Sequence, residues 1–509
     1  MSRRTSAHAR KADDFFLALL SSRGVAAFWI VYCLVHALFR LSVSRSLTLD
    51  DSRANELAQT FSLGYQTRQP PLYEWLLWCI QYFLGPGLPS HLVLRYALIT
   101  ALGLAAFGAA RAAIKDERWA AVASLSMVAS FPVGWSFHEW ATQTILLCIA
   151  CFATLHAALF YLEKPGLRAA AWLGLAIGFG LLAKFSYPLF LGGLILACLS
   201  LPETRGRLAD PRLLLSAAIA FAVVSPYLLW LAEVHGDVIT AVSEAVVQSG
   251  PYGERVLLGL MELIRSLPLF LLPWLAFMML LAPSAFSWPP RKAPAPVLGE
   301  RITLATMIFA ALLAAAGIIA SGATNIAERY MHPILIVAPV YVFARIARIE
   351  RNGDRLRAFA GFSLLMAAVV LGIRFLAVTD NGITKRADYR ALIPFEALAA
   401  ALKERGMTDG TAYTPDVREA GNLRAFLPAM RVIARNSTRL LPPPRRPIDD
   451  RSCILLYPSD QAENAAKVFP IEALAPERIE VRSPPSVLGK SRTGVWWLAR
   501  LDPKSAACE

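Results

Sequence analysis

The fold is decided by residues 169–201, AAAWLGLAIGFGLLAKFSYPLFLGGLILACLSL, a run in which Lys184 is the one charged residue. As a single helix this run would be about 50 Å long, whereas the hydrocarbon core of a bilayer is about 30 Å thick. The length and the central charge therefore predict two short membrane-spanning helices that meet at Lys184.

Similar apolar runs occupy most of the first 379 residues. The chain of 509 residues is 56% hydrophobic and 17% charged, against about 25% charged residues in soluble domains. This composition excludes a disordered chain and an ordinary soluble enzyme. With the two halves of 169–201, the runs predict a polytopic α-helical membrane protein with about eleven transmembrane helices. The other runs are 25–43, 91–110, 119–136, 141–162, 213–233, 256–282, 303–321, 333–347 and 358–378.

The first run, 25–43, is preceded by basic residues, as in a secretory signal peptide. It is long for a signal peptide, contains Arg40 and is followed by no clear cleavage site of small residues, so a retained anchor is expected. The seven cysteines are too few for a disulfide scaffold. Five of them lie in apolar runs, where Cys acts as a small hydrophobic side chain.

The distribution of Lys and Arg predicts the orientation of the chain. Loops on the side of the N-terminus hold about three times as many Lys and Arg residues as loops on the other side, as expected of cytoplasmic loops. We therefore expect a cytoplasmic tail over 1–24, a transmembrane domain over 25–379 with its first outer loop at 44–90, and an outer domain over 380–509. We attribute the net charge of +14 to the Lys and Arg residues of the cytoplasmic loops, so no nucleic-acid partner is expected. Inner and outer loops alternate in this way only if segment 72–84 does not cross the membrane. This segment is rich in Trp and Tyr and is expected to lie in the membrane interface.

The composition changes after residue 379, where charged residues and prolines become frequent. An amphipathic helix is expected at 389–406, ended by Gly406. Strands are expected at 453–458, 478–483 and 495–500, which read CILLYP, RIEVRS and VWWLAR. These elements predict a small α/β domain outside the cytoplasm.

Unusual polar residues collect on the outer side in this arrangement. Acids and bases near a membrane are costly, so their convergence on one face predicts a functional site. The outer loops are expected to hold Asp50, Asp51, Arg53, Tyr73 and Trp75, then His138 and Glu139, then Lys184, then His235, Asp237 and Glu244, and finally Glu328, Arg329 and Tyr330.

Each group of residues can also be explained without a functional role. Asp50 and Asp51 are compatible with a solvated loop, and Lys184 with a side chain that reaches the headgroups. Glu328 and Arg329 are compatible with a local ion pair. His138 and Glu139 are adjacent, so they do not share a helix face, and no metal site is expected from them. No Walker A motif, G-x-S-x-G motif or Rossmann fingerprint occurs, which disfavours an ATP-driven pump, a serine hydrolase and a nicotinamide enzyme.

Three stretches resemble polyprenyl-phosphate-sugar glycosyltransferases of the GT-C type, the relatives of dolichyl-phosphate-mannose–protein mannosyltransferases and of bacterial lipid A aminoarabinose and galacturonic acid transferases. The first is LDDSR at 49–53 with LGYQTRQPPLYEWL at 63–76, FLG at 83–85 and Arg95; the others are GLLAKFSYPLF at 180–190 and EAGNLR at 419–424. The chain departs from the family where Asp51 replaces a Glu, and where ATQT follows Glu139 without a clear acidic residue.

The resemblance implies transfer of a sugar from a polyprenyl-phosphate donor to an acceptor hydroxyl, with inversion at the anomeric carbon. Asp50 matches the acid of the family's first loop and is the expected base. Asp51 is expected to orient Asp50 or bind sugar, and its replacement by Asn to be the milder change. The phosphate of the donor is expected to be bound by Lys184, Arg53 and Arg329. Further contacts to the substrate are expected from His138, Glu139, Glu328 and Tyr330. A lipid-facing entrance is expected at Tyr73, Trp75 and Trp78.

No cofactor and no metal ion are assigned. The expected partners are membrane lipids, the lipid-linked donor and an acceptor on lipid A, a polysaccharide or a protein, at the periplasmic side of a bacterial inner membrane. The alternatives are a lipid or glycolipid transporter and a structural protein with a sensory outer domain. A transporter is disfavoured because no internal repeat is seen and the polar residues lie at one face. A structural role leaves the acid-rich first loop unexplained.

The predicted orientation is tested by fusions after residue 385. A phosphatase fused there is expected to be active and a fluorescent protein dark, because residues 380–509 lie outside the cytoplasm. A fluorescent fusion with an inactive phosphatase would contradict the predicted topology.

Overall fold

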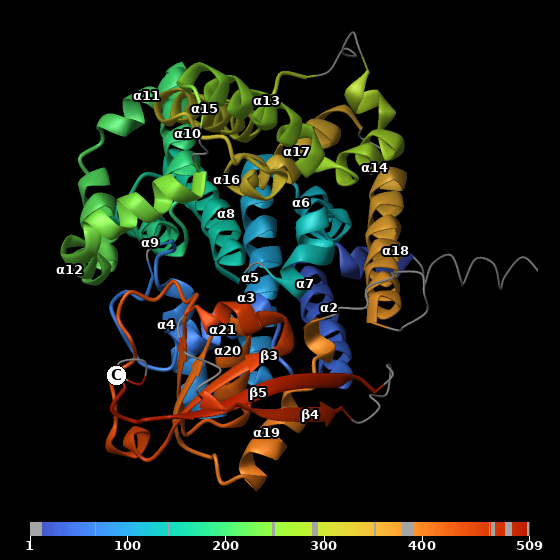
Figure 1. Ribbon diagram of the computed structural model, residues 1–509. Helices are drawn as coiled ribbons and strands as arrows, with labels where there is room; N and C mark the ends of the chain where they lie inside the picture. The colour runs from blue at the N-terminus through green and yellow to red at the C-terminus, as the bar shows by residue number, and fades with distance from the viewer. Residues whose placement is uncertain are drawn as a thin grey trace, which may run out of the picture.

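The computed structural model describes residues 13–66, 68–140, 142–246, 250–287, 294–350, 353–378, 390–467, 469, 474–483, 491–505 and 508. Long helices form most of the molecule, and a five-stranded sheet with its helices lies at one end of them (Figure 1). The predicted basic tail from Arg3 to Lys11 and the domain boundary at 379–380 lie outside the described residues.

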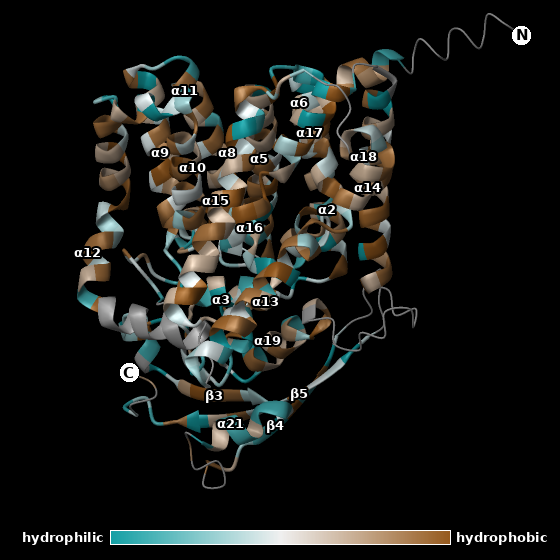
Figure 2. Cartoon of the chain, turned by 90° about the horizontal axis from the view of Figure 1, so that it is seen from above, coloured by the Kyte–Doolittle hydropathy of each residue, from teal (hydrophilic) through white to brown (hydrophobic). Residues whose placement is uncertain are grey.

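Helices occur at each predicted apolar run. Among the described residues seven helices are long and apolar enough to cross a membrane, or ten if each of three bent pairs forms one span, and Leu167–Ala183 is a further, shorter apolar helix. The polytopic helical fold is confirmed, whereas the count of eleven stays a prediction. Figure 2 shows mainly hydrophobic helices with hydrophilic segments toward their two ends. The helices are α2 (Ser22–Val43), α5 (Leu88–Ile114), α6 (Glu117–Leu125), α8 (Thr142–Glu163), α9 (Leu167–Ala183), α10 (Tyr187–Ser200), α12 (Leu213–Val246), α13 (Tyr252–Leu271), α14 (Trp274–Leu281), α15 (Leu298–Ser321), α16 (His332–Leu335), α17 (Ala338–Ile349) and α18 (Gly353–Val378).

The predicted break at Lys184 is confirmed. Helix α9 ends at Ala183 and α10 begins at Tyr187, with Lys184 in extended backbone between them. One predicted boundary is wrong, because α12 continues beyond its apolar run to Val246. The residues His235, Asp237 and Glu244, expected in a loop, therefore belong to that helix.

Two short helices fill the first loop and lie between the long helices and the sheet (Figure 1). They are α3 (Leu49–Leu57) and α4 (Leu72–Leu84). Helix α4 ends at Gly85, whose φ of 73° is a left-handed conformation that glycine adopts without strain. With 13 residues α4 is too short to span a bilayer. Its location in the membrane interface stays a prediction.

The C-terminal domain is an α/β domain, as predicted. Its strand order is β2-β1-β3-β5-β4, with β1, β2 and β3 parallel and β5 antiparallel to β3 and β4. Three strands match the predicted ones, whereas β1 and β2 were not predicted. The expected helix at 389–406 begins at Phe395, after Pro394, and is followed by Gly406 with a φ of 73°. The elements are α19 (Phe395–Glu404), β1 (Gly410–Thr414), α20 (Val417–Phe426), β2 (Met430–Ala434), β3 (Cys453–Pro458), α21 (Ala462–Ala466), β4 (Glu477–Arg482) and β5 (Thr493–Leu501).

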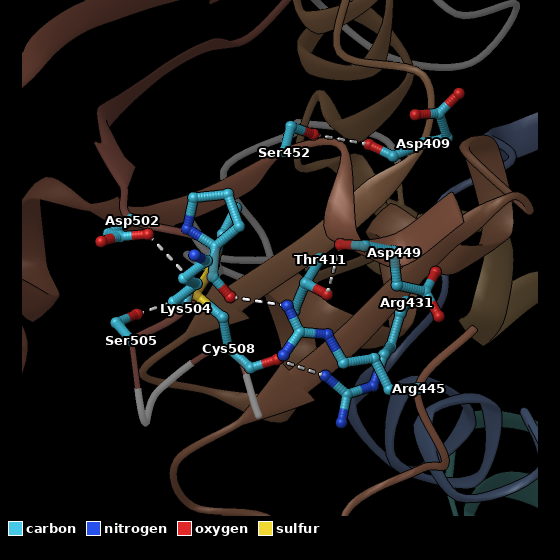
Figure 3. Close-up of a disulfide and its surroundings, with 12 residues drawn as sticks. Asp409, Thr411, Arg431, Arg445, Asp449, Ser452, Asp502, Lys504, Ser505 and Cys508 are labelled. Carbon is cyan, nitrogen blue, oxygen red and sulfur yellow. Dashed lines mark hydrogen bonds between the residues drawn. A yellow bond between two sulfur atoms is a disulfide. The ribbon is translucent and has the colours of Figure 1, made fainter. Parts of the chain in front are cut away.

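A disulfide that was not predicted joins Cys453 on β3 to Cys508 (Figure 3). Arg431 on β2 donates a hydrogen bond to the carbonyl of Cys508 at 2.7 Å, and Arg445 donates one to the carbonyl of Pro503 at 2.6 Å. The C-terminal segment is thereby held against the sheet by one covalent bond and two charged hydrogen bonds.

Candidate active site

Helix α3 places the first two of its acidic residues, Asp50 and Asp51, on different sides. Both lie in the first turn, where negative charge is favourable to the helix dipole. Successive residues on a helix are separated by about 100°, so Asp50 and Asp51 cannot face the same neighbour. Asp50 lines a cavity, while the Asp51 side chain is buried between helices.

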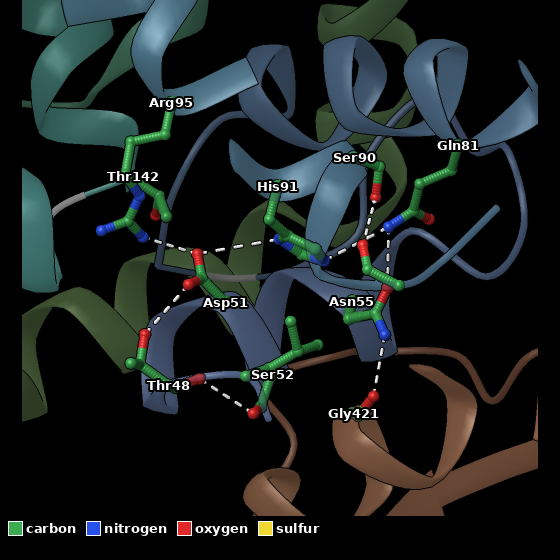
Figure 4. A network of polar contacts seen from close by, with 12 residues as sticks. Thr48, Asp51, Ser52, Asn55, Gln81, Ser90, His91, Arg95, Thr142 and Gly421 are labelled. Atoms are coloured by element: carbon green, nitrogen blue, oxygen red, sulfur yellow. Dashed lines mark hydrogen bonds and ion pairs between the residues drawn. The ribbon is translucent and has the colours of Figure 1, made fainter. Parts of the chain in front are cut away.

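Asp51 forms a buried ion pair that ties α3 to α5. Its Oδ1 lies 2.6 Å from Nη2 of Arg95 and 3.7 Å from Nδ1 of His91, and Thr48 donates to its Oδ2 at 3.0 Å (Figure 4). Although burial alone raises the pKa of Asp51, Arg95, His91 and Thr48 together hold it well below the usual range. Asp51 is therefore an anchor of α3 and does not reach the cavity.

The buried ion pair gives a reason to expect that Asp51→Asn is not a mild change. Breaking a buried ion pair leaves Arg95 as an unpaired buried charge, which costs about 3–5 kcal/mol.

The opposite side of α3 is held by α20 of the C-terminal domain. Asn422 accepts a hydrogen bond from the backbone N–H of Leu47 at 2.7 Å and donates to Oγ of Ser52 at 3.0 Å. Asn55 donates to the carbonyl of Gly421 at 2.8 Å (Figure 4). A Cβ on Gly421 would lie 2.1 Å from the Ser52 carbonyl oxygen, so only glycine allows this close approach. The EAGNLR stretch is thus one of the contacts between the two parts of the chain.

A cavity of about 670 Å³ lies where α3, the ends of several long helices and the C-terminal domain meet, a size typical of a small-molecule site. It brings together six of the predicted residues from three separate segments of the chain. They are Asp50, Arg53, Lys184, Glu328, Arg329 and Tyr330.

Three predicted cations, Arg53, Lys184 and Arg329, share this cavity with Asp50. Arg53 lies one helical turn after Asp50, with Nη1 4.0 Å from Oδ1, and both side chains are about one-third exposed. Lys184 donates from Nζ to Oγ1 of Thr144 at 2.7 Å. The guanidinium of Arg329 lies 5.1 Å from the ring centroid of Tyr330. A carboxylate and several cations therefore share one partly open space.

The cavity has an apolar side as well. Phe131 and Pro132 contribute to it from the segment before α8, and the bend between α13 and α14 contributes four further side chains. Such a lining accommodates hydrocarbon, while the cations accommodate an anion. The four residues at the bend are Leu269, Phe270, Leu272 and Pro273.

Two predicted residues of the second loop lie behind the cavity. Glu139 forms an ion pair with Arg374 on α18, at 3.2 Å. The imidazole Nε2 of His138 lies 2.9 Å from the Tyr32 hydroxyl on α2. Both predicted side chains are buried, so these contacts join helices, and the structure brings neither residue to the cavity.

The predicted aromatic entrance is contradicted at Tyr73, and it stays a prediction at Trp75 and Trp78. Tyr73 is 1% exposed, so it does not face lipid, because it lies on the buried side of α4. Trp75 donates from Nε1 to the carbonyl of Ser62 at 2.8 Å, and Trp78 packs on Phe61. None of these aromatic residues lines the cavity.

Several lining residues were missed by the sequence analysis. The ATQT stretch, noted as a departure from the family pattern, contributes Thr142, Gln143 and Thr144. The QTRQ stretch contributes Gln66, Arg68 and Gln69, and the C-terminal domain contributes Thr438. Apart from Arg68, these residues are neutral, and neutral polar residues carry no energetic signal that marks them as functional. Among the described residues, no group of three His, Cys, Asp or Glu side chains is placed to hold a metal ion.

A second hollow, of about 770 Å³, lies between α2 and α18. Its lining is almost entirely apolar, apart from groups such as Arg23, Tyr32 and His36. No carboxylate belongs to that lining. We call it the α2–α18 groove, and the charged cavity described above the central cavity.

Comparisons with known proteins agree with this picture. Residues 68–230 match the model of the family described as dolichyl-phosphate-mannose-protein mannosyltransferase. The chain is similar to two lipopolysaccharide core galacturonosyltransferases of Rhizobium johnstonii, RgtB (25% identity, covering 81% of this chain and 82% of the relative) and RgtA (26%, covering 79% and 80%).

The fold is similar to that of ArnT from Cupriavidus metallidurans, solved bound to undecaprenyl phosphate and in the apo state. Each comparison gives a TM-score of 0.55 at 14% identity; the first covers 93% of this chain and 98% of ArnT, the second 94% and 98%. The likeness confirms the expected fold class.

The contact between α20 and α3 is tested with Gly421→Ala. The added methyl group must displace the Ser52 backbone, and such overpacking costs about 1–3 kcal/mol. Backbone amides of α3 are therefore expected to exchange hydrogen about 5- to 150-fold faster, measured by mass spectrometry. The control is Gly361→Ala on α18, where a Cβ meets no atom within 4 Å. Unchanged exchange in α3 would contradict the proposed anchoring by the C-terminal domain.

Proposed function

We propose that this chain, a glycosyltransferase of the GT-C type, transfers a sugar from a polyprenyl-phosphate donor to an acceptor hydroxyl at the periplasmic side of a bacterial inner membrane. The observation that carries the proposal is the central cavity, which combines the Asp50 carboxylate, several cations and an apolar side. A lipid-linked phosphate sugar has the matching parts: a hydrocarbon tail, a charged phosphate and a polar ring.

The cations act on the leaving group. When the bond between the anomeric carbon and the phosphate oxygen breaks, the electron pair leaves with the polyprenyl phosphate. Lys184, Arg53 and Arg329 stabilise the negative charge that develops there, and they do so most effectively in a site that excludes bulk water. A phosphate needs no proton to leave, so an acid catalyst is not required.

Asp50 acts on the nucleophile. An acceptor hydroxyl is a weak nucleophile until a base within hydrogen-bond reach accepts its proton. As the acceptor oxygen bonds to the anomeric carbon, its proton passes to the Asp50 carboxylate. Attack on the side opposite the departing phosphate inverts the configuration at that carbon.

The charges of the cavity support a uronic acid as the sugar. Four cationic side chains, Arg53, Arg68, Lys184 and Arg329, face two carboxylates, Asp50 and Glu328. The donor phosphate supplies one negative charge, and a sugar carboxylate supplies a second, so a uronic acid donor balances the site. The similar proteins of Rhizobium johnstonii are named galacturonosyltransferases of the lipopolysaccharide core, and a lipopolysaccharide sugar is the acceptor we propose.

The disulfide supports the periplasmic location of the C-terminal domain. Disulfides persist in oxidising compartments such as the periplasm and are rare in the cytosol. Because Thr438 and α20 of this domain adjoin the central cavity and α3, a periplasmic domain also puts the reaction on that side. The proposed organisation is a cytoplasmic tail over 1–24, a transmembrane domain over 25–379 and a periplasmic domain over 380–509.

The function is tested by transfer from undecaprenyl phosphate galacturonic acid to lipopolysaccharide core in membranes, read by mass spectrometry. Wild-type protein is expected to add one uronic acid, and Asp50→Asn to lose about 10²–10⁴-fold in rate while it accumulates normally. Asp51→Asn is expected to lower accumulation instead, since it unpairs Arg95. Near-normal turnover in Asp50→Asn would exclude its role as base.

Lys184 is tested by two substitutions, Lys184→Ala and Lys184→Arg. A phosphate-binding lysine is a compact point charge that Arg does not replace, whereas a lysine that only reaches the headgroups tolerates Arg. We expect Ala to reduce transfer about 10²–10³-fold and Arg to reduce it clearly, with unchanged protein level. Full activity of Lys184→Arg would make this lysine a membrane anchor.

A further inference from the structure

A chain of hydrogen bonds between polar side chains forms one wall of the central cavity. It runs from Thr142 and Gln143 at the start of α8, through Glu74 on α4, to Gln66 in the first loop and Thr438 in the C-terminal domain. The four outer members line the cavity, and Glu74 lies behind them with no exposed surface. We call these five residues the polar wall.

Glu74 fixes the orientation of both amides in this wall. Its Oε1 accepts hydrogen bonds from Nε2 of Gln143 at 2.8 Å and from Nε2 of Gln66 at 3.1 Å. Burial raises the pKa of Glu74 to about 7, although hydrogen bonds from these amides lower it. Oε1 accepts in either protonation state, so both amide nitrogens are directed toward Glu74.

The two threonines hold the amide oxygens of the wall in place. Thr142 donates to the amide oxygen of Gln143 at 2.7 Å, and Thr438 donates to that of Gln66 at 2.8 Å. Each threonine oxygen then keeps free acceptor capacity, and each amide keeps a second N–H. The wall therefore offers donors and acceptors side by side, held in fixed positions by three separate parts of the chain.

We propose that the polar wall binds the ring hydroxyls of a sugar in the central cavity and so determines which sugar is accepted. A hydroxyl donates one hydrogen bond and accepts others, which matches a surface of alternating donors and acceptors. The wall carries no exposed charge, so it complements the neutral edge of the ring, while Arg and Lys residues elsewhere hold the anionic groups. This inference rests on the proposed function, and it applies to the sugar of the donor or to that of the acceptor.

A site built from hydrogen-bonding side chains discriminates between ring configurations. An epimer that turns one hydroxyl away from the wall leaves buried polar groups unpaired, which costs more than the loss of an apolar contact. The participation of Thr438 also gives the C-terminal domain a part in recognition in addition to holding α3.

The threonines allow closely matched variants. Thr438→Val and Thr142→Val keep the side-chain volume and remove the hydroxyl, whereas Thr438→Ser and Thr142→Ser keep the hydroxyl. Tyr82→Phe on α4 removes a hydroxyl from an exposed side chain of the same region and serves as the control. Restoration by Ser of what Val loses separates a lost hydrogen bond from a change in folding.

The experiment compares binding of undecaprenyl phosphate with that of undecaprenyl phosphate galacturonic acid, and also measures the KM for the lipopolysaccharide acceptor. If the wall binds the donor sugar, each Val variant weakens binding of the sugar-bearing lipid about 2- to 10-fold and leaves the sugar-free lipid unchanged. If it binds the acceptor sugar, the acceptor KM rises by a similar factor while both lipids bind normally. Ser variants and Tyr82→Phe are expected to behave as wild type.

Val variants that bind both lipids normally and keep the acceptor KM would overturn the proposal. Equal weakening of the sugar-free and sugar-bearing lipids would overturn it as well, because the wall would then act on the phosphate or on the fold. A wild-type protein that binds neither lipid refutes the proposed function itself, and the role of the wall fails with it. This outcome differs from a failure of the wall proposal alone, because it is already seen in the wild-type protein.

Discussion

The ion pair between Asp51 and Arg95, 2.6 Å long and almost fully buried, is the interaction on which the rest of the site depends. It fixes the rotation of α3 about its axis, since Asp51 must face α5. The neighbouring Asp50 and, one turn later, Arg53 are then directed into the central cavity. A buried pair of this kind adds little net stability, because the cost of removing both charges from water offsets their attraction. Its contribution is to hold α3 in one orientation.

The central cavity belongs to neither part of the chain alone. Lys184 reaches it from the break between α9 and α10, Arg329 from the segment before α16, and Thr438 from the C-terminal domain. Helix α3 contacts both parts, with Arg95 on one side and Asn422 on the other. A glycosyl transfer at a membrane surface needs a lipid-accessible side, a charged centre and a polar side for sugars. The long helices, helix α3 and the C-terminal domain together supply an apolar side, a charged centre and a polar side in one space.

The sequence predicts those parts of the site in which a charged residue lies in apolar surroundings, because such a charge is costly. Lys184, Asp50 and Arg329 stand out for that reason, and the structure brings them together. Sequence alone does not show toward which neighbour a charge points. Asp51 and Glu139 were therefore assigned to the site, although each pairs with an arginine behind it. Neutral residues such as Gln66, Gln143 and Thr438 were missed because they depend on contacts far apart in the chain. The same reason explains the missed disulfide between Cys453 and Cys508 and the two unpredicted strands.

The central claim is that the lipid phosphate binds in the central cavity, beside Asp50. The most direct test is an electron cryomicroscopy structure of the protein in lipid nanodiscs with undecaprenyl phosphate. The predicted result is density for the phosphate within hydrogen-bond reach of Lys184, Arg53 or Arg329, with the prenyl chain along the apolar side near Phe270. Phosphate density in the α2–α18 groove, with the central cavity free of lipid, would contradict the account.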